Sequence, residues 1–101
     1  MKQFLVKYRR QNGTPEEWHR EIARFIANID ADPAIKGKVG YRCLKARDGA
    51  DYFHIATVYE DSGQAALQTK DWFKAYQGAT KAVSGGTVEV LPLELVAETR
   101  G

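Results

Sequence analysis

The sequence has little cysteine, no long apolar run and almost no net charge. Its 101 residues include one cysteine, Cys43, which cannot form a disulfide within the chain, and a lone thiol fits a reducing compartment. No apolar run approaches the roughly 20 residues that span a bilayer, and the first residues, MKQFLVKY, lack the apolar core of a secretory leader. These absences predict a cytoplasmic protein without a membrane partner.

The charge is too balanced to indicate a nucleic-acid partner. The formal net charge is +2, from 15 Lys and Arg against 13 Asp and Glu spread along the chain. Lys7, Arg9 and Arg10 form the densest basic group, which a solvated strand end explains. Zinc-ligand spacing, phosphate-binding loops, the GxSxG elbow and the GxGxxG fingerprint are all missing. The sequence therefore predicts no metal and no cofactor.

What is present is an ordinary globular composition, 44% hydrophobic and 28% charged. A chain of 101 residues predicts a single domain over residues 1–101. A domain of this size buries only about two thirds of its unfolded surface, so it gains stability from oligomerisation.

The clearest local signal is the start of a helix at Thr14-Pro15-Glu16-Glu17. Thr14 is a good N-cap, Pro15 suits the first helical position, and Glu17 can complete a capping box. Apolar residues then recur at helical spacing, at Trp18, Ile22, Phe25, Ile26 and Ile29. His19 lies off this stripe and is expected to face solvent. The helix is expected to end near Asp30, before Asp32-Pro33.

Four strands are predicted, over residues 3–9, 39–47, 52–60 and 87–99. They follow from alternating side chains and from turns at Gln11-Asn12-Gly13 and Asp48-Gly49. The second and third strands have apolar residues on both faces. Because helices cover only one face of such a sheet, the other face is predicted to meet a partner subunit. Pro92 confines the long fourth strand to a sheet edge or a bulge.

A second helix in two pieces is predicted between the third and fourth strands. Asp61 or Ser62 is expected to cap the first piece, and Asp71 to cap the second after a break at residues 69–71. Trp72, Phe73 and Tyr76 then follow helical spacing until Ser84-Gly85-Gly86. The element order is βαββαβ, and it predicts an α+β, ferredoxin-like fold: a four-stranded antiparallel sheet with the helices on one face.

The stretch TVYEDSGQAALQTKDWFKAY, residues 57–76, resembles the antibiotic biosynthesis monooxygenase superfamily of dimeric α+β barrels. In that family a strand ends in an aromatic residue and an acidic pair, and then leads into an alanine-rich helix and an aromatic pair. Tyr59 stands where family members often have tryptophan. Trp72-Phe73 stands where many have histidine-phenylalanine, a departure that disfavours haem degradation and weakens a phenol oxygenase built on that histidine.

The resemblance implies a homodimer with the two sheets face to face and a pocket between helices and sheet. It also implies a cofactor-independent monooxygenase acting on a small aromatic, quinol or polyketide-type substrate. Such chemistry needs a base or hydrogen-bonding group and aromatic walls. The candidate catalytic residues are His54, Trp72 and Tyr76, with Trp72 and Tyr76 on one helical face. The candidate substrate-binding residues are Tyr52, Arg42 and Phe73.

Four of the candidates have a structural alternative, and the activity has alternatives too. His54 fits a hydrogen-bonded histidine of the sheet or of a dimer interface, and Trp72 and Tyr76 fit aromatic packing in the core or interface. For Arg42 a cross-strand ion pair is the favoured role. A dimeric barrel that only binds a small molecule, or that isomerises one, fits the same sequence. An RNA-recognition domain has the same element order, but residues 52–59, YFHIATVY, lack the glycines and leading basic residue of its signature.

Overall fold

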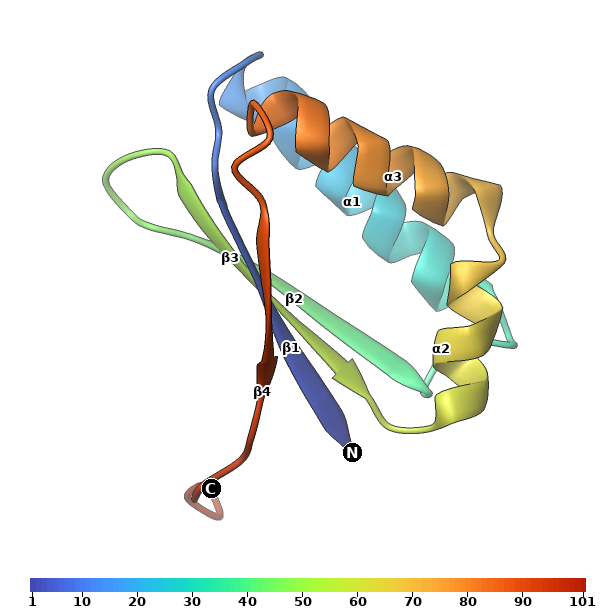
Figure 1. Cartoon of the computed structure of the whole chain (residues 1–101). Coiled ribbons are helices and arrows are strands. Elements are labelled where there is room, and N and C mark those ends of the chain that lie inside the picture. The colour runs from blue at the N-terminus through green and yellow to red at the C-terminus, as the bar shows by residue number, and fades with distance from the viewer.

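The computed structural model describes all residues, 1–101, and its elements follow the predicted βαββαβ order with the second helix divided (Figure 1). The elements are β1 (Lys2–Arg9), α1 (Pro15–Ala31), β2 (Val39–Lys45), β3 (Asp51–Val58), α2 (Asp61–Gln68), α3 (Asp71–Val83) and β4 (Glu89–Leu93).

The four strands form one antiparallel sheet in the order β2-β3-β1-β4. The helices all lie on one face of that sheet, with α1 and α3 side by side (Figure 1). This arrangement confirms the predicted ferredoxin-like α+β fold. None of the three helices has the length and apolar character that crossing a bilayer requires.

The start of α1 is as the sequence predicts. Thr14 is the N-cap, and its hydroxyl oxygen accepts a hydrogen bond from the Glu17 backbone N–H at 3.2 Å. Pro15 occupies the first helical position, where no N–H is needed. The apolar stripe packs on the sheet and buries Trp18, Ile22, Phe25 and Ile29.

The break between α2 and α3 is confirmed, but the predicted side-chain caps are wrong. The N-caps are Glu60 and Lys70, and neither helix start has a side-chain cap hydrogen bond. Asp61 instead pairs with Lys2 across 2.8 Å. The α2 helix ends where the Thr69 hydroxyl donates to the Ala66 carbonyl at 2.7 Å, a competition with the backbone that favours helix termination.

The fourth strand is much shorter than the predicted residues 87–99. It ends at Leu93, which pairs with Gln3 near the start of β1. Beyond that point β1 offers only two more residues, so residues 94–101 have no strand to pair with and form an exposed tail (Figure 1). Ladder hydrogen bonds need a partner strand, and the length of β1 therefore sets the length of β4.

The two faces of the sheet differ in cover. On the helical face Tyr8, Val39, Tyr52 and His54 are buried. On the other face Leu5, Phe53 and Ile55 are only half-buried, and Leu44, Leu91 and Leu93 are exposed. The apolar character of both faces, read from the strand sequences, is thus present in the folded chain.

Candidate functional site

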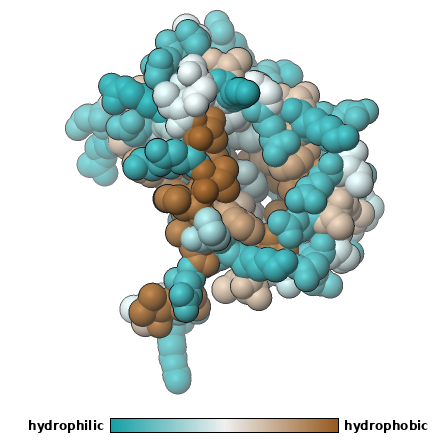
Figure 2. Space-filling view, viewed as in Figure 1, coloured by the Kyte–Doolittle hydropathy of each residue, from teal (hydrophilic) through white to brown (hydrophobic).

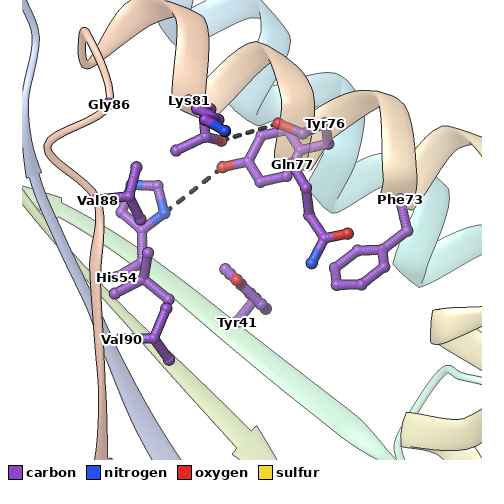
Figure 3. Close-up of a pocket in the computed structure, with 11 residues that line it drawn as sticks. Tyr41, His54, Phe73, Tyr76, Gln77, Lys81, Gly86, Val88 and Val90 are labelled. Atoms are coloured by element: carbon purple, nitrogen blue, oxygen red, sulfur yellow. Dashed lines mark hydrogen bonds between the residues drawn. The ribbon is translucent and has the colours of Figure 1, made fainter.

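A cavity of about 300 Å³ lies between α3 and the helical face of the sheet (Figure 3). All four strands contribute to it, and α3 supplies one side. Figure 2 shows apolar residues gathered along β4, beside the opening between that strand and the helical layer. The lining residues are Val6, Tyr41, His54, Phe73, Tyr76, Gln77, Thr80, Lys81, Gly86, Val88 and Val90.

The cavity continues toward α2 as a second hollow of about 230 Å³. The two share Val6, Tyr41, Phe73, Gln77 and Val90. Its other walls are mostly apolar, from Phe4, Val39 and Leu67. The two hollows are therefore neighbours that share one wall, and most of that wall is apolar.

The residues of α3 that face the cavity follow helical geometry. Phe73, Tyr76, Gln77, Thr80 and Lys81 lie at spacings of three and four residues, and so share one side of the helix. Tyr76 and Thr80 are buried, whereas Gln77 and Lys81 are exposed. The cavity is therefore closed at its His54–Tyr76 end and open where Gln77 and Lys81 lie.

A row of hydrogen-bonded side chains leads from α1 to the inner end of the cavity. The Trp18 indole N–H donates to the Tyr8 hydroxyl at 2.7 Å. That hydroxyl lies 3.0 Å from His54 Nε2, and His54 Nδ1 lies 3.5 Å from the Tyr76 hydroxyl. His54 is only 1% exposed, and Figure 3 shows it facing Tyr76 across the inner end.

Burial keeps the inner end of the cavity uncharged. It lowers the pKa of His54 to about 4, so the imidazole is neutral at physiological pH. Burial also raises the pKa of the Tyr41 and Tyr76 hydroxyls well above their usual range. The nearby thiol of Cys43 has its pKa raised to about 11 by the same cause. These groups can exchange hydrogen bonds with a ligand but bear no charge of their own.

Lys81 is the one charged side chain that lines the cavity. It lies in the last turn of α3, exposed to solvent, and forms no ion pair with a carboxylate of the chain. A free cation at the mouth of an apolar cavity attracts ligands with a negative charge. The cavity thus combines neutral hydrogen-bonding groups inside with one positive charge at its mouth.

Three of the six predicted site residues meet at this cavity. His54 projects from β3, and Phe73 and Tyr76 project from α3. His54 and Tyr76 are hydrogen-bonding neighbours, although 22 residues separate them. Phe73 also lines the second hollow and supplies an apolar wall to both.

The other three predicted site residues lie away from this cavity. Trp72 is one position before Phe73, a rotation that turns it toward α1, where it packs against Phe25. Tyr52 is 2% exposed, stacks on Tyr8 and hydrogen-bonds His19 at 2.9 Å. Arg42 is on the opposite face of the sheet, because strand side chains alternate and Tyr41 and Cys43 face the helices.

Several residues that line or support the cavity are not predicted from the sequence. The sequence pattern places Tyr8 and Tyr41 in strands and gives no further sign of a site. It places Gln77 and Lys81 in a helix, as ordinary polar residues. The spacing of Gln77 and Lys81 from Phe73 was the available signal, since residues four and eight positions on share a helix face. The pairing of Tyr8 with Trp18 and His54 depends on strand register, which the sequence alone does not supply.

The cavity offers no set of metal ligands. No three His, Cys, Asp or Glu side chains of the chain are gathered where they could hold a metal ion. The polar atoms at the inner end belong to His54, Tyr76, Tyr41 and Thr80.

Comparison with solved structures gives close matches over nearly the whole chain. SnoaB, a cofactor-independent oxygenase from Streptomyces nogalater, matches in a mutant form with a TM-score of 0.75 and 22% identity, over 99% of this chain and 97% of that one. A candidate antibiotic biosynthesis monooxygenase from Caulobacter crescentus matches with a TM-score of 0.75 and 14% identity, over 95% and 90%. Rv0793 from Mycobacterium tuberculosis matches with a TM-score of 0.72 and 10% identity, over 96% of each chain.

No family model and no curated protein sequence matches the chain. The likeness to these proteins is therefore one of backbone fold, and their sequence identity to this chain is low. It agrees with the resemblance drawn from residues 57–76, and the chain has the fold of the antibiotic biosynthesis monooxygenase-like proteins.

Proposed function

We propose that this protein is a cofactor-independent oxygenase that oxidises a small phenolic or quinol substrate, of the polyketide type, inside the cavity. The observation that supports this most directly is the buried His54–Tyr76 pair at the inner end of an otherwise apolar cavity. Electron-rich aromatic substrates need apolar walls and a few well-placed polar groups, and this cavity has both.

The chemistry needs nothing that the substrate and dioxygen do not supply. An activated ring CH₂, as in an anthrone, becomes a carbonyl, so the substrate loses two hydrogen atoms and gains one oxygen atom. The second oxygen atom leaves as water, and the substrate provides all four electrons. The protein's contribution is to hold the substrate as its phenolate or enolate, the form that reacts with dioxygen, and to exclude bulk water.

Within this proposal His54 and Tyr76 contact the reacting part of the substrate. Phe73 and Tyr41 form the aromatic walls, and Lys81 attracts the anionic form at the mouth. Trp72, Tyr52 and Arg42 are left out, because their side chains do not line the cavity. A cavity of about 300 Å³ is at the lower end of the usual range for ligand pockets, so a substrate of a few fused rings is the best fit.

We also propose that the protein works as a homodimer joined through the uncovered sheet face. Leu44, Leu91 and Leu93 are 47%, 46% and 41% exposed on that face, beside half-buried Leu5 and Phe53. The tail adds Leu95 and Val96, the latter 93% exposed. Contiguous exposed apolar surface of this kind marks an interaction site, and a second copy offers a surface of the same shape and character.

The test of the activity is oxygen uptake by purified, metal-free protein with a panel of anthrones, quinols and catechols. Uptake that needs no added flavin or metal and falls at least about tenfold in the Tyr76→Phe variant supports the proposal. The matched control is Tyr59→Phe, a tyrosine exposed on the strand end and outside the cavity. Equal uptake in all three proteins would contradict the site assignment.

A protein that binds the panel compounds without consuming oxygen would overturn the oxygenase and favour a binding or isomerase role.

The dimer is tested separately by sedimentation at micromolar concentration. A dimer that dissociates when Leu91 is replaced by Arg is the expected result, since a charge on the buried apolar face is costly. A monomer in the unaltered protein would contradict the dimer proposal.

A further inference from the structure

The row of hydrogen bonds from Trp18 to His54 has a direction. An indole N–H can only donate, so the Tyr8 hydroxyl oxygen must accept from Trp18. The Tyr8 hydroxyl proton then has one acceptor within reach, His54 Nε2 at 3.0 Å. Tyr8 is 3% exposed, and no water can replace that acceptor cheaply in a closed aromatic environment.

Two arrangements of the His54 proton can be compared by counting satisfied groups. With the proton on Nδ1, Trp18 donates to Tyr8, Tyr8 donates to Nε2, and Nδ1–H donates to the Tyr76 oxygen. With the proton on Nε2, Tyr76 would donate to Nδ1, but Tyr8 would accept from both neighbours and its own proton would have no partner. Each arrangement thus makes three hydrogen bonds and leaves one tyrosine proton over. In the first that proton belongs to Tyr76, which lines the cavity and can donate into it, and in the second it belongs to Tyr8, which does not line the cavity. A buried donor without a partner is strongly disfavoured, so the first arrangement is favoured.

We propose that Trp18 and Tyr8 hold His54 in the Nδ1–H tautomer, which makes His54 a hydrogen-bond donor toward the cavity and not a general base. Trp18 and Tyr8 are positioning residues here, because neither lines the cavity. Both act through the imidazole. The tautomer is a property of the protein without substrate. Only the role of His54 in the reaction rests on the proposed function.

The fixed tautomer determines what the cavity recognises. Because the Tyr76 oxygen accepts from Nδ1–H, its hydroxyl proton can point at a ligand. The inner end thus offers a donor, and Lys81 adds a positive charge at the mouth. Such a site takes a phenol or enol acidic enough to arrive as its anion, and its donors stabilise that oxyanion.

The experiment is a long-range ¹H–¹⁵N correlation spectrum of the imidazole nitrogens in uniformly ¹⁵N-labelled protein near neutral pH. The neutral tautomers give distinct nitrogen shifts, and His19→Gln identifies which of the two histidines each signal belongs to. We expect His54 to show a protonated Nδ1 and an unprotonated Nε2, with the Nδ1–H form in about tenfold excess or more. A dominant Nε2–H form, or an even mixture, would overturn the proposal.

The positioning role is tested by Tyr8→Phe, which removes the donor to Nε2 and keeps the ring. Unconstrained histidine prefers the proton on Nε2, so the Nε2–H fraction should rise in this variant. The matched control is Tyr52→Phe, whose ring stacks on Tyr8 at 5.1 Å without a hydrogen bond to His54, and it should leave the tautomer unchanged. An unchanged spectrum in Tyr8→Phe would contradict the positioning role.

These spectra need no substrate, so they separate this inference from the proposed function. The expected tautomer in a protein without oxygen uptake supports the inference and overturns only the oxygenase. Oxygen uptake together with the Nε2–H tautomer supports the oxygenase and overturns the donor role of His54.

Discussion

The helical face of the sheet has two halves that are filled very differently. In the closed half, α1 packs onto the sheet through edge-on rings, with Trp18 against Tyr8 and Phe25 against Tyr41. In the hollow half, α3 faces the valines Val6, Val88 and Val90, and a cavity remains. The same sheet supports both halves, so side-chain size, more than backbone arrangement, determines where the site lies.

The boundary between the halves is a plane of aromatic rings. Tyr76 stacks on Phe25 with ring centroids 3.9 Å apart and on Trp18 at 5.7 Å. One side of the Tyr76 ring therefore belongs to the closed half, and its hydroxyl belongs to the hollow half. This placement fixes the polar end of the cavity against a rigid wall, which is what a preorganised site requires.

The largest expected effect comes from opening the closed half. Phe25 is 2% exposed, so the Phe25→Ala variant should lose about 3–5 kcal/mol of unfolding free energy, because it leaves a void among packed rings. Phe73→Ala, on the hollow side, should lose less than half as much unfolding free energy, since one side of the Phe73 ring faces the cavity and packs against nothing. Urea unfolding of both variants measures the difference, and equal losses would remove the distinction between the halves.

The next effect is a pH dependence of stability caused by His54, which lies at the boundary between the two halves. Its pKa is lowered from 6.5 to about 4 by burial, so the unfolded chain binds more protons than the folded one between these pH values. Stability should therefore fall as the pH drops from about 6.5 toward 4, by up to about 3 kcal/mol. Urea unfolding across this range in wild type and His54→Gln measures it. A wild-type slope that survives in His54→Gln would assign the dependence to other groups.

A smaller effect is expected from closing the hollow half. Gln77 lies at the mouth shared by the two hollows, and Gln77→Trp should weaken binding of an aromatic ligand by about tenfold, roughly 1.4 kcal/mol, with little change in stability. Lys74→Trp is the matched control, because Lys74 is exposed on α3 and lines none of these hollows. Fluorescence titration with a catechol or quinol measures both, and equal affinities would place the ligand elsewhere.

The smallest effect tests the start of α1, the helix of the closed half. Thr14→Ala removes the acceptor for the Glu17 N–H and should cost about 1 kcal/mol of unfolding free energy. Thr14→Ser keeps the oxygen and should restore most of it. Thermal unfolding of the pair measures this effect, and equal losses in both variants would show that the hydroxyl is not the cause.

The sequence predicted the framework well because its signals are local. The cap at Thr14, the stripe through Phe25 and the turn at Gly49 each depend on residues within a few positions of one another. The positive φ of 120° at Gly49 is one that glycine adopts without strain. The element order and the ferredoxin-like sheet followed from these local patterns.

The site was predicted only in part, because it depends on rotations and registers. Trp72 and Tyr76 do share contact with Phe25, as their spacing indicates, but the cavity is on the other side of Tyr76. Arg42 was assigned to the site although one position of strand alternation puts it on the opposite face. The row from Trp18 to His54 joins three elements, and no pattern within one element could reveal it.

The short fourth strand also limits how the chain can associate. An exposed sheet edge can add strands from other molecules without end, but β4 has five residues, contains Pro92 and leads into a tail with Glu94 and Glu98. Short length, proline and charge are the features that protect edge strands from such addition. The β4 edge is therefore protected against the open-ended strand addition that builds fibrils.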